Sequence, residues 1–229
     1  MHISEGVLAA PVLLAGGAGT ILGLTIGLRR MDVREIPKVA LLTAAFFVAS
    51  LIHVPIGVSS AHLILNGILG ILLGWTAFPA IFIGLFFQAV LFQFGGLTTL
   101  GVNTLNMAAP AVIMGALARP VLRSSGLFAM VMTAIAGAGA IVLSAAMVAG
   151  SLALSGESFV AVSKLIFMAH IPIAIAEGVL SVLIISFLLK TKPEVIKGNM
   201  HSRATKLGLV SIIIIPILIG ICSQAHAHR

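Results

Sequence analysis

Eight apolar runs follow one another along this chain, and each is long enough, or nearly long enough, to cross a lipid bilayer. The runs are Val7–Leu28, Val39–Ile52, Leu63–Ala77, Ala80–Phe94, Leu105–Ala118, Leu127–Leu154, Pro172–Leu189 and Leu207–Ile221. A perpendicular helix needs about 20 residues, so the shorter runs are expected to tilt or to be covered by neighbours. Only 8% of the 229 residues are charged, against about 25% in soluble domains. We therefore predict an all-α integral membrane protein and exclude a cytosolic enzyme, a disordered scaffold and a nucleic-acid reader.

The distribution of basic residues predicts the orientation of the chain. If the N-terminus lies outside, 11 of the 13 Lys and Arg residues fall in inner loops, and only Lys164 and Arg229 lie outside. Inner loops of membrane proteins carry an excess of basic residues, so we predict that the N-terminus is outside. It has no basic leading region and no cleavage-like site after the first run, so the first run is not expected to be removed as a signal peptide.

The last part of the chain differs from the rest. We divide the chain into a membrane domain, residues 1–192, and residues 193–229, a basic cytoplasmic loop followed by a hydrophobic segment. That segment is either an eighth span or a signal-like stretch that leads into the His-Ala-His-Arg ending. The single cysteine, Cys222, excludes a disulfide framework and a thiolate metal cluster.

Polar side chains within apolar segments indicate where a membrane protein acts. One set is predicted on the outer side: His2, Glu5, His53, His62, Asn66, Gln93, Asn103, Asn106, His170 and Glu177. The stretch 93–107, rich in Gly, Thr and Asn, is interpreted as irregular backbone. Such backbone is tolerated at membrane depth only when it is packed in protein or lines a cavity.

The first two residues form a metal chelator if the amine is free. The amine of Met1, the deprotonated amide of His2 and Nδ1 of the His2 ring would close two fused rings and supply three coplanar nitrogens. A fourth nitrogen would complete the square that Ni(II) and Cu(II) favour. The alternative is that His in second place is chance.

His62 is the first candidate for the fourth nitrogen, because it follows a turn-rich loop on the same predicted side as the N-terminus. The alternative for His62 is a helix-capping or interface residue. His53 and His170 are further candidates, although packed or interfacial histidines are the simpler interpretation for both. A ligating imidazole needs its other N–H oriented by a polar group. The candidates for that role, or for alternative ligands, are Glu5, Asn66, Asn103 and Glu177.

Three motifs resemble those of the cobalt/nickel S components of energy-coupling-factor (ECF) transporters, the CbiM/NikM type. They are Met-His-Ile-Ser-Glu-Gly at residues 1–6, Gly-Val-Ser-Ser-Ala-His-Leu at 57–63, and the Gly-Gly-Leu-Thr-Thr-Leu-Gly-Val-Asn segment within 88–107. His170-Ile171-Pro172 and Glu177-Gly178 fit as well, and the resemblance covers roughly residues 1–192.

The resemblance implies a six-helix S-component bundle with an extra N-terminal helix, in a prokaryotic cell (inner) membrane. It implies a metal held by the Met1 amine, the amide and ring nitrogens of His2, and His62. It also implies partners: a transmembrane coupling (T) subunit, a cytoplasmic ATPase pair and, in nickel systems, a small accessory membrane subunit or segment. The second run, with Ala40 and Ala44, matches the helix that S components present to the coupling subunit. Leu63 after the loop histidine favours nickel over cobalt as the cargo.

Two other function classes have sequence requirements of their own. An intramembrane metalloprotease would need a His-Glu-x-x-His motif, which does not occur. An ion-coupled transition-metal carrier or channel acting without ATPase partners would need intramembrane charge relays, for which only Glu177 and His170 are candidates. The chain has no G-x-x-x-x-G-K-[ST] motif, so it is expected to be a transport subunit, not an enzyme, and to obtain energy from partner ATPases.

Overall fold

The computed structural model describes residues 2–51, 53–56, 59–122 and 126–196, and for residues 53–56 and 59–61 it describes the backbone alone. The described residues fall into two units. The first unit ends at Ser186, and the second begins at Phe187. Within the second unit, the helix that reaches Thr191 is followed by a turn in which Val195 N–H donates to Lys192 O. The predicted eighth span and the His-Ala-His-Arg ending lie outside the described residues.

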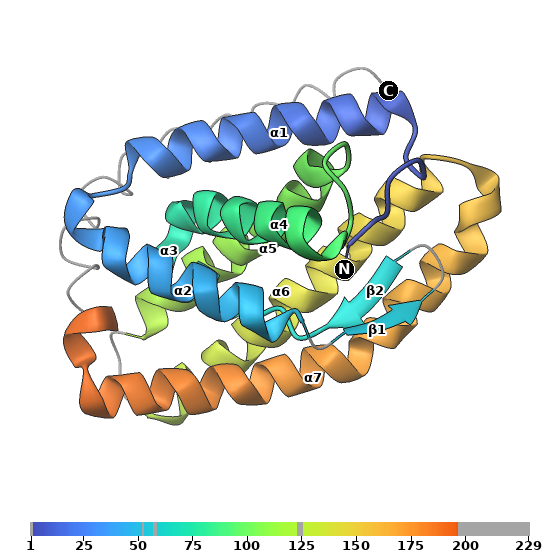
Figure 1. Cartoon of the computed structure of the whole chain (residues 1–229). Coiled ribbons are helices and arrows are strands. Elements are labelled where there is room, and N and C mark those ends of the chain that lie inside the picture. Colours follow the sequence, from blue (N-terminus) through green and yellow to red (C-terminus); the bar gives the residue numbers. More distant parts are fainter. Residues whose placement is uncertain (1, 52, 57–58, 123–125, 197–229) are drawn as a thin grey trace, which may run out of the picture. The chain divides into compact units, whose positions relative to one another are not determined.

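Helices make up nearly all of the described chain (Figure 1). The α-helices are α1 (Ala10–Arg29), α2 (Ile36–Ala49), α3 (Asn66–Leu73), α4 (Ala77–Phe92), α5 (Leu100–Val121), α6 (Leu127–Ala153) and α7 (Val160–Thr191). Short 3-10 turns lie at η1 (Val33–Glu35), η2 (Gly74–Thr76) and η3 (Glu157–Phe159).

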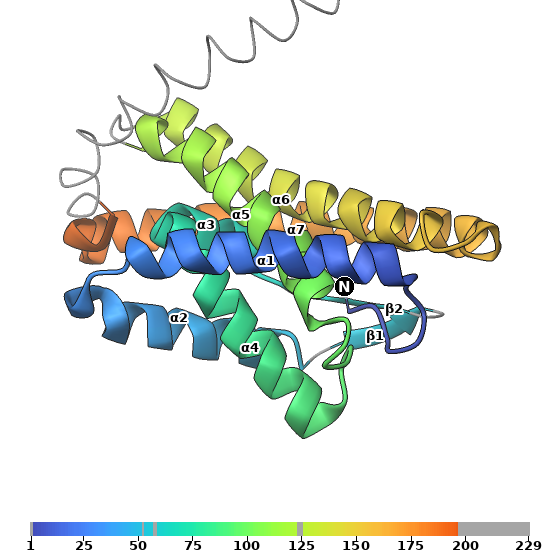
Figure 2. The ribbon, with the colours of Figure 1, turned by 90° about the horizontal axis from the view of Figure 1, so that it is seen from above.

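Helix α5 is the central element of the first unit. It packs against α1, α3, α4 and α6, and Figures 1 and 2 show it crossing behind α4 and beside α6. Small residues allow these crossings. A Cβ atom added to Gly115 would overlap the backbone of Gly70, and one added to Gly70 would overlap the backbone of Ala111. The α3–α5 contact is therefore a contact between two backbones.

The third and fourth predicted spans form one interrupted helical stretch. Helix α3 has only eight residues, all of them buried, and η2 joins it to α4. The two predicted runs, Leu63–Ala77 and Ala80–Phe94, therefore make one candidate span over Asn66–Phe92. The break has a local cause, because Gly74 adopts φ = 60°, a conformation that favours glycine.

The carbonyl groups at the end of α3 receive hydrogen bonds from basic side chains. Arg119 of α5 donates from Nε to Ile71 O at 2.7 Å and from Nη2 to Gly70 O at 2.9 Å. Lys38 of α2 donates to Leu72 O at 2.9 Å. Carbonyl groups left free at a helix end need such partners, and cations there also complement the helix dipole. A buried helix can therefore end at Leu73 without orphaned acceptors at these three positions.

A small hairpin accompanies the helices of this all-α fold. Strands β1 (His53–Ile56) and β2 (Ser59–His62) pair antiparallel, with His53 opposite His62. The sequence of this stretch predicts only a turn-rich loop between helices. The hairpin lies beside the N-terminal segment in Figures 1 and 2.

Two other boundaries differ from the prediction. Irregular backbone was expected over 93–107, but only 93–99 is non-helical and α5 begins at Leu100. The helix accommodates Asn103 and Asn106, whose side chains bond to Ile3 and Thr99 and to Ser151, respectively. Helix α7 begins twelve residues before the predicted Pro172, since 160–171 is mostly apolar. Proline inside a membrane helix is tolerated when neighbouring groups satisfy the freed backbone.

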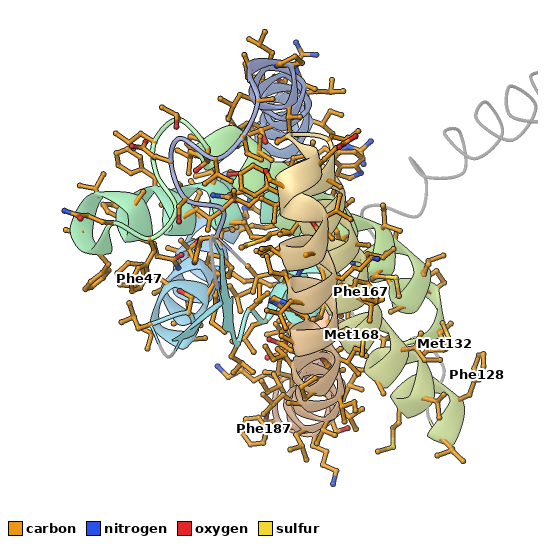
Figure 3. All side chains as sticks on the ribbon, turned by 90° about the vertical axis from the view of Figure 1, so that its right-hand side faces the viewer. Phe47, Phe128, Met132, Phe167, Met168 and Phe187 are labelled. Carbon is orange, nitrogen blue, oxygen red and sulfur yellow. The ribbon has the colours of Figure 1, made fainter. Side chains whose placement is uncertain are left out.

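Five helices of the described part are long and apolar enough to cross a membrane: Ala10–Arg29, Asn66–Phe92, Leu100–Val121, Leu127–Ala153 and Glu157–Thr191. Figure 3 shows large apolar side chains projecting from the outer faces of the helices, among them Phe128 and Met132 of α6 and Met168 of α7. Phe128 is 64% exposed and Met168 is 61% exposed. Apolar exposure of this extent suits contact with lipid, as expected for a multi-pass membrane protein.

Candidate metal centre

Two histidines that are far apart in the sequence meet in the interior. The rings of His2 and His62 are stacked, with centroids 4.7 Å apart and an angle of 18° between their planes. Both residues are buried, at 4% and 3% exposure. The ring of Phe94 also stacks with the ring of His2, and the two centroids are 6.1 Å apart. The predicted pairing of His2 with His62 is thus present as a direct ring contact.

The hydrogen bond of His62 defines which ring nitrogen can bind a metal. Its Nδ1 lies 2.9 Å from Leu63 O, and because a carbonyl oxygen only accepts, Nδ1 must carry the proton. Nε2 is then the nitrogen with a free lone pair, and it is buried without a hydrogen-bond partner. Burial lowers the pKa of His62 well below its ordinary value, with further contributions from nearby His2 and His170. The ring is therefore neutral at pH 7, as a metal ligand must be.

The segment that follows His2 is fixed to the start of α5 through its backbone. Asn103 accepts from Ile3 N–H at 2.9 Å and donates to Ile3 O at 3.1 Å. Thr99 also donates to Ile3 O, at 2.9 Å. Further along, the carboxylate of Glu5 accepts from Thr98 N–H at 3.0 Å. The side chains of Asn103 and Glu5 therefore hold the N-terminal segment that carries His2.

Two glycines allow this close approach. A Cβ atom on Gly96 would overlap the side chain of Glu5, and one on Gly95 would lie 2.9 Å from Asn103 Nδ2. Gly95 also has φ = 79°, where L side chains are strained. The Gly-Gly pair between α4 and α5 thus has a packing role in holding the N-terminal segment.

Glu177 and Asn66 take different partners. Glu177, fully buried on α7, accepts from Ile64 N–H at 2.5 Å and from Leu65 N–H at 2.7 Å through Oε1. Asn66 donates to Met107 O and Ser144 Oγ, at 3.1 and 2.9 Å. The hydrogen bonds of Asn66 therefore tie α3 to α5 and α6. The ring of His62 is oriented instead by the carbonyl group of Leu63.

The remaining candidates lie as follows. His170 is 1% exposed on α7; its Nδ1 lies 2.7 Å from Ile166 O, and its buried Nε2 has no hydrogen-bond partner. In its neutral form, His170 therefore carries its proton on Nδ1, as His62 does. The backbone of His53 pairs with that of His62. Met1 lies outside the described residues.

Sequence reasoning missed three contributors: Phe94, the carbonyl of Leu63, and Thr99. The Gln-Phe-Gly-Gly sequence marks a turn but gives no sign of ring stacking, and a backbone carbonyl has no sequence signature. Thr99 stood within a stretch that was interpreted as irregular, where its hydroxyl could not be assigned a partner.

Side chains alone do not make a closed metal site in the described part of the chain. No group of three or more His, Cys, Asp or Glu residues there is arranged to hold a metal ion. Two imidazoles meet, and any further donors must come from the backbone or the amino terminus. This is a nitrogen-rich, neutral and buried environment, which suits borderline ions such as Ni(II), Co(II) and Cu(II) better than Mg²⁺ or Ca²⁺.

Comparison with known proteins identifies the family. Residues 2–195 match the family described as the cobalt uptake substrate-specific transmembrane region, CbiM. The chain belongs to this family. A Haemophilus influenzae protein named for metal transport is 44% identical over 198 residues, which cover 85% of this chain and 96% of that protein. The cobalt transport protein CbiM of Kyrpidia tusciae is 30% identical, with 88% of each chain covered.

Solved structures agree with this assignment to the CbiM family. The crystal structure of a transition metal transporter superposes with a TM-score of 0.72 at 28% identity, covering 83% of this chain and 93% of that one. A truncated transition metal transporter gives a TM-score of 0.71, with 83% and 99% covered. The all-α membrane fold and a role in cobalt or nickel transport are therefore confirmed for this CbiM-family chain.

Proposed function

We propose that this chain is the metal-binding subunit of an ECF-type importer, and that it captures Ni(II), or Co(II), on the outer side of the membrane. The proposed ligands are the amine of Met1, the amide and ring nitrogens of His2, and Nε2 of His62. The observation that carries the proposal is the buried His2–His62 ring pair, with Nδ1 of His62 occupied by a carbonyl and Nε2 left as the donor.

The surroundings support this assignment. Asn103, Thr99 and Glu5 fix the segment just after His2, so the backbone that follows this proposed ligand is held before the metal arrives. A preorganised ligand set loses less conformational freedom on binding. His53 and His170 are kept as alternative ligands, to be separated from His62 by the experiment below.

An energy source must come from other subunits, because the chain lacks a nucleotide-binding motif. Curated relatives include a fused nickel transport protein NikMN of Rhodobacter capsulatus and a fused CbiMQ protein of Methanocorpusculum labreanum. We infer a transmembrane coupling subunit and a pair of cytoplasmic ATPases as partners. An apolar groove between α2 and α4, lined by Ala40, Ala44 and Phe47 on one side and Ile83, Phe87 and Leu91 on the other, supports docking of the coupling subunit there.

The first experiment measures nickel per chain in the purified native protein and in a form with two alanines before Met1. Two residues are needed. One alanine would place His2 third, where the amine, two amides and the ring form a new four-nitrogen chelate. A form with two alanines after Arg229 is the control for chain extension.

Native protein and control are expected to retain about one nickel ion with the diamagnetic spectrum of square-planar Ni(II), and the N-terminal extension almost none. Equal binding in all three forms would show that His62, His53 and His170 make the site without the amine. Uptake of nickel into vesicles by this chain alone, without nucleotide, would favour an ion-coupled carrier instead.

A further inference from the structure

Glu177 is a buried carboxylate that lies on a helix distant in sequence from both histidines. It is 0% exposed, and its Oε1 accepts hydrogen bonds from two backbone amides of the segment that joins β2 to α3. A buried carboxyl group is costly unless it is hydrogen-bonded. The pairing with Ile64 and Leu65 N–H therefore fixes this segment to α7 strongly.

One peptide group links Glu177 to His62. The N–H of Ile64, which donates to Glu177, belongs to the same planar peptide unit as the C=O of Leu63. That carbonyl accepts the proton of His62 Nδ1 at 2.9 Å. The carboxyl group, the peptide plane and the imidazole thus form a chain of two hydrogen bonds, and it ends at the ring whose Nε2 is buried without a hydrogen-bond partner. Hydrogen bonds in such chains strengthen one another.

The backbone beside this peptide needs external support. Leu65 has φ = 59°, a left-handed conformation that is unfavourable for a residue with a side chain. It occupies the N-cap position of α3, and its own side chain makes no capping hydrogen bond. Glu177, on another helix, accepts from the N–H of Leu65, as the glutamate of a capping box accepts from an N-cap amide, and also from the N–H of Ile64.

We propose that Glu177 is a positioning residue for the metal site: through the peptide between Leu63 and Ile64, it holds the ring of His62 with Nδ1 protonated and Nε2 directed at the metal. This inference rests on the proposed function only in assuming that His62 binds a metal. In known metal sites a carboxylate often bonds the ligating histidine directly. Here the peptide group stands between them, so Glu177 acts without touching the ring.

The proposal is tested by measuring the nickel affinity of variants that keep or remove the hydrogen-bond acceptor at position 177. Glu177→Gln keeps a carbonyl oxygen that can accept from both amides, whereas Glu177→Met keeps a similar volume and removes the acceptor. Ser181→Ala, one turn further along α7, removes a buried hydroxyl from the same helix and is the matched control. We expect Glu177→Met to weaken nickel binding by about 10- to 100-fold, the range for groups that orient a ligand. Glu177→Gln is expected to recover most of this loss and Ser181→Ala to cause none.

The tautomer of His62 gives a readout that needs no metal. In ¹⁵N-histidine-labelled protein without metal, with His62 assigned by its absence in His62→Gln, the wild type and Glu177→Gln should show Nδ1 protonated. Glu177→Met should show a mixture of the two tautomers. A role of Glu177 in general packing would leave this signature unchanged in the folded protein.

The outcomes separate this inference from the proposed function. If the wild type binds no nickel but the tautomer changes in Glu177→Met, the proposed function fails and the positioning role stands. If Glu177→Met retains the wild-type tautomer, or if it binds nickel as tightly as the wild type does, the positioning role is wrong. If Glu177→Met fails to fold, Glu177→Gln decides the matter, because that variant keeps the acceptor. The proposal is overturned if Glu177→Gln loses both the Nδ1-protonated tautomer of His62 and the affinity for nickel.

Discussion

At the scale of the residue, the interior keeps the His62 imidazole neutral. Its ring is buried, its Nδ1–H is donated to a carbonyl, and burial lowers its pKa below the ordinary 6.5. The unfolded chain therefore binds a proton at His62 at a higher pH than the folded chain does. Stability that depends on this ring is fully present above pH 6.5 and is lost as the pH falls toward the lowered pKa.

We expect the metal-free protein in detergent to show a Tm that falls as the pH is lowered from about 7 to about 5. The fall should be smaller in His62→Gln, which cannot take up the proton. His201→Gln, which changes a histidine of the basic loop, serves as the control and should follow the wild type. Parallel Tm curves for all three proteins would show that His62 does not titrate in this range.

The same residue shows why sequence reasoning succeeded in part. His2 and His62 were paired by their chemistry and by their predicted side, and the rings do meet. Asn66 was a candidate to orient the His62 ring. However, β2 ends at His62 and Leu65 is left-handed, so no helix joins the two residues. The bonds that orient His62 involve backbone groups, which every residue has and no motif reveals.

At the scale of the element, α3 is a short buried helix held at both ends by charged side chains. Glu177 accepts from the amides before it, and Arg119 and Lys38 donate to its last carbonyls. Its flank lies directly on α5, where Gly70 and Gly115 bring the two backbones together. The position of α3 therefore depends on the absence of side chains at this crossing.

Gly115→Ala should destabilise the protein because its Cβ would meet the backbone of Gly70, which cannot move without shifting α3. We expect a loss of roughly 1–3 kcal/mol, as for overpacked cores, or failure to accumulate folded protein. Gly150→Ala in α6 is the matched change, since a Cβ there meets nothing within 4 Å. It should be neutral or slightly stabilising, because alanine favours helix. Thermal unfolding of both variants in detergent decides the matter, and equal Tm values would contradict the tight crossing.

Hydropathy located the helices well but not their interruptions. The apolar runs coincide with α1, α2, α4 and α6 to within a few residues, since burial in lipid or protein requires them. The break at Gly74 was not predicted, because a single glycine within an apolar run does not reveal that it adopts a positive φ. The hairpin at His53–His62 was missed because its apolar and small residues also suit a loop.

At the scale of the whole molecule, three basic residues from two predicted inner loops gather around one end of α3. Arg119 and Lys38 bond to its last carbonyls, and Arg30 lies over the ring of Trp75 in η2, 5.4 Å from its centroid. The two predicted inner loops therefore lie at the same end of α3, as they must if they share one side of the membrane.

Cysteine labelling tests the orientation. In a Cys222→Ser background, Leu154→Cys and Val33→Cys introduce thiols at two positions that are each 78% exposed. With the N-terminus outside, a membrane-impermeant maleimide added to intact cells should label residue 154 and should reach residue 33 only after permeabilisation. The reverse pattern would invert the topology and place the proposed metal site on the inner face.

The contact between Arg30 and Trp75 has an optical consequence. The chain contains one tryptophan and no tyrosine, so its long-wavelength ultraviolet emission comes from a single indole. That indole lies where the end of α1 meets the turn after α3, and these two helices follow His2 and His62 in the chain. The protein therefore carries an intrinsic single-site fluorophore at this joint, and its emission spectrum reports the polarity and mobility of that one place without an introduced dye.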